Sequence, residues 1–144
     1  MSKHAIIIIK KDDEYLNYYD QRWNCYLFPN CKIEENTSIS KYVSKILEIE
    51  ENQINAKFIK EITHKKFSES AKIEKEYNHY FYKVEIKNIK DKFKEKEFTV
   101  KETKYKWFNT REFEEDERIQ KVNSDIIYYV KKIEIDRSNT WKRT

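Results

Sequence analysis

Arg22 and Trp23 stand next to each other in the chain, and this pair could recognise a nucleotide. A guanidinium offers N–H donors in a planar fork that matches phosphate oxygens, and an indole ring offers a surface on which a base can stack. The pair also fits a purely structural role, with the tryptophan in the core and the arginine on the surface. Lys32 is a further cation that could meet a phosphate, although a solvent-exposed lysine would look the same in the sequence.

A second group of candidate phosphate ligands consists of two cations and two hydroxyls close together in the chain, Lys65, Lys66, Ser68 and Ser70. Such side chains suit phosphate oxygens. They fall in the segment 64–76, which has no regular apolar period, so we expect a long loop there. Loops of this length are uncommon in compact domains and are often functional. A solvated loop without a function would have the same composition, so both interpretations stand.

His79 and Tyr80 lie in an aromatic segment that is expected to form a strand. The alternation of side chains along a strand places His79 on one face with Tyr77 and Phe81, and Tyr80 on the other face. Either face could stack a base, although buried aromatic residues usually belong to the core. The other two histidines, at positions 4 and 64, have no sequence neighbours that suggest catalysis.

Three glutamates, Glu48, Glu50 and Glu51, are the candidate metal ligands. We expect a helix that begins at Thr37 or Ser38 and stops near Asn52. Glu48 and Glu51 would then lie one turn apart on its exposed face, with Glu50 nearby. Carboxylate oxygens are the ligands that Mg²⁺ prefers, although glutamates at helix ends are usually just solvated.

Nucleophilic catalysis and zinc binding have little support in the sequence. Cys25 and Cys31 form no CxxC pair and have no identifiable base, and the chain has only three histidines. No Ser/His/Asp or zinc-ligand arrangement stands out. We expect free thiols in a reducing cytoplasm.

The elements that must position these residues follow from apolar periodicity and from turn and cap signals. Strands and helices alternate in an order that predicts the α/β class, as a mixed α/β sandwich. The final helix is expected to begin near Ser124, and an Asn109–Glu112 capping box should start a short helix before it. The expected strands are 5–10, 15–19, 23–28, 57–63, 77–86, 98–100 and 104–108, and the main helices are 37–52 and 124–133.

Length and composition limit the function further. The 144 residues suit one domain, expected at 1–136 with a polar C-terminal tail at 137–144. The net charge of +4 is a small difference between 30 basic and 26 acidic residues. It mildly favours an anionic ligand and does not argue for binding to long nucleic acid. The apolar run 5–9 is too short to span a bilayer, so no membrane association of this chain is expected.

The segment from Trp23 to Asn52 around Pro29, the only proline, resembles the signature of the Nudix hydrolase family. That signature runs Gly, five residues, Glu, seven residues, Arg-Glu, an aliphatic residue, any residue, Glu-Glu, any residue, Gly, and an aliphatic residue. We align the Pro-Gly-Gly that precedes it on Pro29-Asn30-Cys31. The signature then falls on Cys31 (Gly), Thr37 (Glu), Lys45-Ile46 (Arg-Glu), Leu47 (aliphatic), Ile49-Glu50 (Glu-Glu) and Asn52 (Gly).

The resemblance implies a Nudix-like α/β/α sandwich with a mixed sheet. Enzymes of the family use helix carboxylates to hold magnesium against a diphosphate. Ile46 and Ile49 offer no oxygen ligands, so the box is degenerate and turnover by the family's route is not expected. If the chain is active, the resemblance implies a Mg-dependent nucleotide pyrophosphohydrolase in which Glu50 is the catalytic carboxylate.

Other segments carry the resemblance further. The late strand KYKWFN, 104–109, is similar to the family strand that precedes a short helix, and the family places substrate contacts near Arg22 and Trp23. A looser similarity, through Trp23 before Phe28-Pro29 and Lys66-Phe67-Ser68 before the aromatic strand, is to divergent Nudix domains of bacterial cyclic-nucleotide signalling in antiphage defence. Such domains are thought to sense a nucleotide rather than hydrolyse it.

Three hypotheses follow. In the first, a Nudix-fold domain binds a nucleotide or cyclic oligonucleotide without catalysis and without a cofactor, through Arg22, Trp23, Lys32, Lys65, Lys66, Ser68, His79 and Tyr80. In the second, it is a divergent metal-dependent hydrolase of a nucleoside diphosphate-linked compound that uses Mg²⁺. In the third, it is a protein-interaction scaffold. A homodimer is compatible with each of them.

Overall fold

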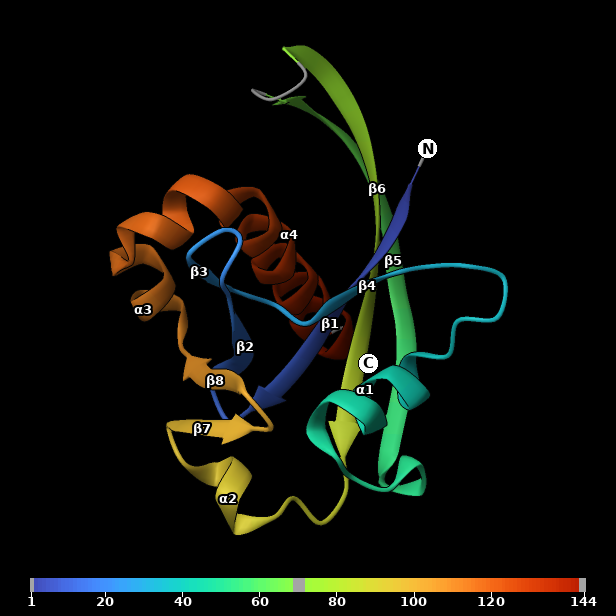
Figure 1. Cartoon of the computed structure of the whole chain (residues 1–144). Coiled ribbons are helices and arrows are strands. Elements are labelled where there is room, and N and C mark those ends of the chain that lie inside the picture. Colours follow the sequence, from blue (N-terminus) through green and yellow to red (C-terminus); the bar gives the residue numbers. More distant parts are fainter. Residues whose placement is uncertain (1, 69–71, 143–144) are drawn as a thin grey trace.

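The computed structural model describes the backbone of residues 2–68 and 72–142 and the side chains of residues 2–66 and 72–135. Its centre is an eight-stranded sheet in the order β5-β6-β1-β2-β8-β7, with β3 paired to β2 and β4 paired to β1 (Figure 1). β1 and β6 run parallel and the other pairs run antiparallel, so the sheet is mixed. The strands are β1 (Lys3–Lys11), β2 (Glu14–Asp20), β3 (Cys25–Leu27), β4 (Asn30–Lys32), β5 (Ile54–Ser68), β6 (Ile73–Ile86), β7 (Glu97–Val100) and β8 (Thr103–Phe108). The helices are α1 (Ile39–Leu47), η1 (Glu51–Gln53), α2 (Asp91–Lys94), α3 (Thr110–Glu115) and α4 (Glu117–Lys142).

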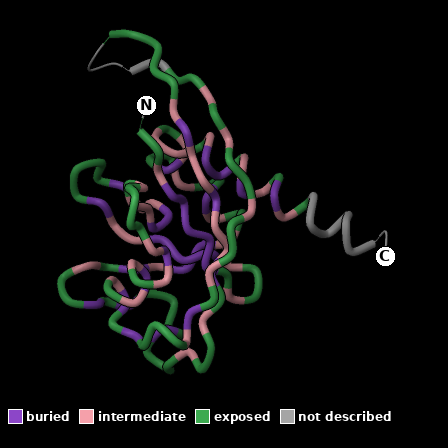
Figure 2. The backbone as a smooth tube through the Cα atoms, turned by 90° about the vertical axis from the view of Figure 1, so that its right-hand side faces the viewer, coloured by how far each residue is buried: buried purple, intermediate pink, exposed green. Residues whose placement is uncertain are grey.

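Helices cover both faces of the sheet. Ile7 of β1 lies in one core cluster with Val43 of α1, whereas Ile8, the next residue of β1, lies in a second cluster with Phe113 of α3 and Ile126 of α4. This alternation buries β1 on both faces, as its continuous apolar run predicts. Figure 2 shows the buried residues gathered along the middle of the molecule. The expected α/β/α sandwich with a mixed sheet is confirmed. Within the described residues, no helix is both long enough and apolar enough to cross a membrane.

β1 and β2 form a hairpin and then separate, and β3 and β4 fill the space between them. The turn contains Asp12, in the left-handed conformation. β1 and β2 pair only next to this turn, after which β2 pairs with β3 and β1 pairs with β4. The Ile7 amide donates to the Pro29 carbonyl at 2.9 Å, which fixes the β3–β4 connection. The expected strand 23–28 is shorter, because Trp23 lies in a turn.

Helix α1 begins where the sequence predicts and ends earlier. The Ser38 side chain accepts a hydrogen bond from the Lys41 amide and caps the helix. The helix stops at Leu47, and Glu48 adopts the left-handed conformation with φ 54°. Glycine is the usual residue at this kind of helix end, and the chain contains none, so no stop signal marks this position in the sequence. The expected helix to Asn52 is therefore wrong over its last turn.

The expected loop at 64–76 is also wrong, because most of it belongs to a long β5–β6 hairpin. The two strands stay in register from Lys60↔Phe81 to Ser68↔Ile73. The hairpin extends beyond the rest of the sheet (Figure 1), and the described residues 72–76 at its far end are exposed. Because both faces of this part meet solvent, its side chains need no apolar alternation, and cross-strand backbone hydrogen bonds alone define it as sheet.

The C-terminal helices confirm one expectation and correct another. Asn109 and Glu112 form the predicted capping box at the start of α3. α4 is much longer than the expected helix 124–133 and reaches Lys142, so the backbone of the expected tail is helical up to that residue. Asn123 interrupts α4 with non-helical angles, φ −131° and ψ 16°, just before residue 124, where the expected helix begins. The domain boundary at residue 136 stays a prediction.

Asn17 on β2 is fully buried, and neither its Oδ1 nor its Nδ2 has a hydrogen-bond partner among the described residues. Replacing Asn17 with leucine, which has a similar size, is expected to raise the free energy of unfolding by about 1 kcal/mol, because it removes the desolvation cost of the amide. Urea unfolding measures this change. Asn30→Leu is the matched control: the Asn30 Nδ2 donates to the Phe28 carbonyl at 2.9 Å, so this variant should lose stability. A loss of stability in Asn17→Leu as well would show that the Asn17 amide is hydrogen-bonded in solution.

Candidate functional site

A pocket of about 200 Å³ opens between the sheet, the β3–β4 connection and α4. Its walls are apolar and aromatic side chains, and its polar groups are two amides, two imidazoles and a phenol. A mostly apolar cavity with a few convergent polar groups is the usual form of a small-molecule site. The lining residues are His4, Ile6, Leu27, Phe28, Asn30, Tyr77, His79, Asn123 and Ile126.

The strand pairing explains why residues far apart in sequence meet here. His4 of β1 is the parallel partner of His79 of β6, and their ring centroids lie 6.5 Å apart. His64 of β5 lies on the other side of His79, and its Nε2 is 2.8 Å from His79 Nδ1. The three histidines of the chain therefore form a row across adjacent strands on the face that α4 covers.

Asp125 of α4 faces this row. Its Oδ2 lies 3.8 Å from His64 Nδ1 and 3.6 Å from Lys66 Nζ. Lys66 Nζ also donates to the carbonyl of Val122 at 3.2 Å, next to the interruption of α4 at Asn123. Lys66 thus connects the hairpin to α4.

Burial lowers the pKa of His79 from 6.5 to about 4, and His64 next to it adds to the shift. Removal of an imidazole from water disfavours its charged form, and a neighbouring imidazole has the same effect when it is protonated. His79 is therefore neutral near neutral pH. Its Nδ1 is bonded to His64, so Nε2 is the ring nitrogen that has no partner among the described residues.

Arg22 and Trp23 are both exposed and do not line this pocket. The Arg22 side chain is 85% exposed and lies 3.6 Å from the Asp20 carboxylate. Trp23 is 52% exposed, which contradicts the alternative that it is a core residue. Its carbonyl accepts hydrogen bonds from Arg118 Nε and Nη2 at 3.0 and 2.6 Å, and these hold its turn against the start of α4.

The other expected ligand residues are divided between the two faces of the sheet. Tyr80 lies on the face away from α4, where its ring is 5.9 Å from Phe58 and 5.8 Å from Lys3 Nζ. Lys65 is exposed on β5. Lys32 is exposed and is the antiparallel partner of His4, so it lies on the pocket face of the sheet. Ser70 and the side chain of Ser68 lie outside the described residues.

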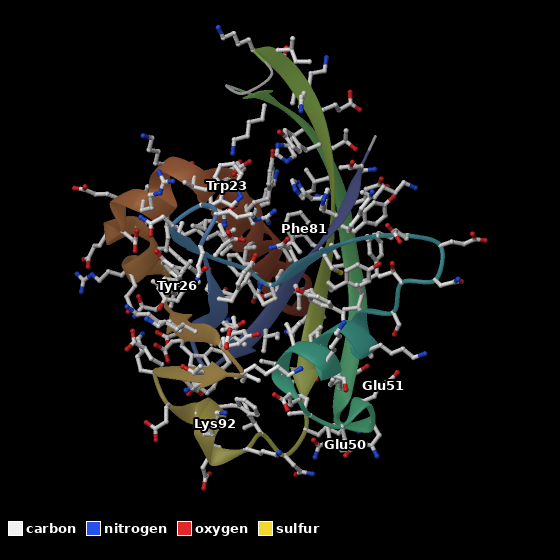
Figure 3. All side chains as sticks on the ribbon, viewed as in Figure 1. Trp23, Tyr26, Glu50, Glu51, Phe81 and Lys92 are labelled. Carbon is white, nitrogen blue, oxygen red and sulfur yellow. The ribbon has the colours of Figure 1, made fainter. Side chains whose placement is uncertain are left out.

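The glutamates do not form the expected helical cluster. Glu48 and Glu51 cannot share a helix face, because α1 ends at Leu47 and Glu51 belongs to η1. All three glutamates are exposed, and Figure 3 places Glu50 and Glu51 beyond the end of α1, far from Trp23. Among the side chains of 2–66 and 72–135, no three His, Cys, Asp or Glu residues are arranged to hold a metal ion. The donors at this helix end therefore do not fit a magnesium ion.

The two thiols are poor nucleophiles. Burial raises the pKa of Cys25 to about 11, and it also raises the pKa of Cys31. A thiol reacts as its thiolate, which these environments disfavour.

Sequence reasoning found His79 and missed most of the residues around it. His4 and His64 have no partners nearby in the sequence, because their partners come from other strands. Asn123 lies just before the expected start of the final helix at residue 124. Asp125 lies inside that expected helix, but nothing in the sequence places it beside the histidines. The one signal in the sequence that could have found the histidine row is that His4 and His79 both lie in strands. Using this signal requires knowing that β1 pairs with β6.

No protein-family model matches the sequence, and no curated protein matches it. Solved structures match it in fold. A NUDIX hydrolase from Nitrosomonas europaea has a TM-score of 0.54 and 12% identity, covering 90% of this chain and 88% of that one. A hydrolase of the NUDIX family from Clostridium perfringens has a TM-score of 0.52 and 11% identity, covering 92% and 94%.

A third match, an ADP compounds hydrolase, has a TM-score of 0.50 and 12% identity, and the match covers 91% of this chain and 71% of that one. Identities this low show the fold alone. These matches agree with the mixed sheet and the several helices of the structure. The protein has the Nudix fold.

Proposed function

We propose that this protein binds a nucleotide, with the base in the pocket between β1, β6 and α4, and that it does not hydrolyse it. The observation that carries the proposal is the pocket itself, whose apolar walls end in imidazole and amide groups from His4, His79, Asn30 and Asn123. Apolar walls suit the faces of a base, and polar groups at defined positions suit its edge.

The size of the pocket supports one base as the buried part of the ligand. Pockets that enclose whole drug-sized ligands measure about 300–1,000 Å³, and this one measures about 200 Å³. The sugar and phosphates would then lie outside it. Lys32 is the nearest of the expected phosphate ligands by strand position, since it pairs with His4 on the pocket face. We assign it the phosphate contact.

The residues at the end of α1 support the proposal that the protein does not hydrolyse its ligand. Ile46 packs against the core, Ile49 is buried, and the neighbouring glutamates point to no common centre among the described residues. Within the described part of the chain, no carboxylate cluster there could hold a metal ion and activate water.

The test is a binding screen with nucleoside mono-, di- and triphosphates and cyclic mono-, di- and trinucleotides. The cyclic compounds belong in the panel because of the sequence similarity to nucleotide-sensing Nudix domains. At least one compound is expected to raise the melting temperature, and calorimetry then measures its affinity. If no compound has an effect at millimolar concentration, the proposal is wrong.

Ile126→Trp is expected to fill the pocket and weaken binding of that compound at least about tenfold, because an indole would occupy the place of the base. Ile135→Trp is the matched control, since Ile135 lies on the same helix and is 60% exposed. Asn123→Leu is a milder second variant that keeps the volume and removes one amide from the wall. Equal affinity in all three variants would place the ligand elsewhere.

A phosphate-release assay on the same compounds separates the hydrolase hypothesis from binding. Phosphate release that requires Mg²⁺ or Mn²⁺ and disappears in Glu50→Gln would establish a divergent hydrolase and overturn the non-catalytic part of the proposal. A protein that binds no nucleotide and releases no phosphate would leave the scaffold hypothesis.

A further inference from the structure

The hydrogen bond between His64 and His79 leaves one ring nitrogen for a ligand. His64 Nε2 and His79 Nδ1 are 2.8 Å apart, so one of them donates and the other accepts. His79 lines the pocket, and its Nε2 has no partner among the described residues. Whether this Nε2 donates or accepts depends on which ring carries the shared proton.

Asp125 lies close enough to His64 to influence the direction of this bond. Its Oδ2 lies 3.8 Å from His64 Nδ1, which is too long for a hydrogen bond but close enough for the carboxylate to favour a proton on that nitrogen. When His64 carries its proton on Nδ1, its Nε2 is bare. That nitrogen accepts from Nδ1–H of His79, and Nε2 of His79 is then left without a proton.

Aromatic packing fixes both rings in this arrangement. The Tyr77 ring stacks on His79 with an interplanar angle of 5°. His64 packs edge-on against Tyr129 of α4 at 5.4 Å between centroids. The rings of Tyr77 on β6 and Tyr129 on α4 therefore hold the two imidazoles in place.

We propose that Asp125 and His64 hold His79 in the tautomer whose bare Nε2 accepts a hydrogen bond from an N–H group of the ligand. The inference rests on the proposed function and narrows its ligand to heteroaromatic bases that present an N–H donor inside the pocket. Burial keeps the His79 ring neutral, which preserves the acceptor. Asp125 and His64 are positioning residues, and His79 is the residue that contacts the ligand.

The first test uses the free protein and needs no ligand. Proton–nitrogen correlation NMR on protein labelled in its histidines distinguishes protonated from bare ring nitrogens. At about pH 7, His79 is expected to carry its proton on Nδ1. In Asp125→Asn the Nε2–H tautomer should become populated, because the charge that orients His64 is gone. Asp91→Asn, on a fully exposed aspartate of α2, should leave the spectrum of His79 unchanged.

The second test compares purine nucleotides that differ in N–H donors. Adenosine, guanosine and inosine monophosphates carry such donors on the base, whereas purine riboside monophosphate carries none. At least one of the first three is expected to bind about tenfold tighter than purine riboside monophosphate, since a missing donor leaves the buried acceptor unpaired. The ratio should fall towards one in Asp125→Asn and in His64→Phe, which retains an aromatic ring at this position.

The outcomes separate this inference from the proposed function. A proton on Nε2 of His79 in the wild-type protein overturns the inference, and so does equal binding of purine riboside monophosphate. A failure of every nucleotide to bind overturns the proposed function, and the tautomer seen in the free protein then decides whether Asp125 and His64 orient His79.

Discussion

Phe28→Ala is expected to lower the free energy of unfolding by about 3–5 kcal/mol. Phe28 is 1% exposed and lies where β3 leads into β4 in the gap between β1 and β2. Its ring packs against Tyr15 at 6.1 Å and against Phe113 at 5.5 Å between centroids. Truncation leaves a cavity that the surrounding rings cannot close, because strands on both sides hold them. Equilibrium unfolding in urea measures the loss.

Phe58→Ala is the matched control for this change. Phe58 is 49% exposed on β5, so the same truncation should cost well under 1 kcal/mol in stability. Because Phe28 also lines the pocket, Phe28→Ala should weaken nucleotide binding even under conditions in which the variant is folded. Similar losses of stability in the two variants would contradict the conclusion that packing of Phe28 in the core stabilises the fold.

Acidification is expected to destabilise the protein through His79. The pKa of this ring is lowered from 6.5 to about 4 in the fold. Between these two values the unfolded chain binds one more proton than the folded protein, so the free energy of unfolding falls as the pH falls through this window. Above pH 6.5 the ring is neutral in both states and this loss does not occur. If the site excluded water completely, the free energy of unfolding would fall by about 3 kcal/mol. Partial access of solvent reduces the expected loss to about 2 kcal/mol.

Groups on several elements face His79 and affect its titration. A His79 variant isolates the contribution of this ring to the pH dependence of stability. The difference in unfolding free energy between wild type and His79→Gln should change by that amount between pH 7 and pH 4, because carboxylates elsewhere titrate equally in both proteins. A difference that stays constant over this range would show that His79 titrates normally. The facing groups are His64 and Lys66 of β5, His4 of β1, Tyr77 of β6 and Asp125 of α4.

Features set by neighbouring residues could be predicted from the sequence. The β1–β2 turn, the Ser38 cap and the Asn109–Glu112 capping box each depend on a few adjacent positions, and each is present in the structure. The end of α1 at Glu48 was missed, because the chain has no glycine to mark it and the change in backbone angles at that residue has no other signal in the sequence. The consequence was functional, since the expected glutamate cluster depended on a longer helix.

By itself the element order of the sequence determined a mixed α/β sandwich, since runs such as 5–9 must be buried and helical stripes require a sheet to cover. The α/β/α arrangement of its layers was implied by the resemblance to the Nudix family. The sequence also determined that Ile46 and Ile49 offer no metal ligand. Only the tertiary structure decided that the segment 64–76 is mostly strand and that the pocket is lined by His4 and His79 with Asn123. The physical reason is that cross-strand pairing makes the hairpin and that strand pairing and helix docking bring His4 next to His79, 75 positions away, and no local periodicity carries either kind of information.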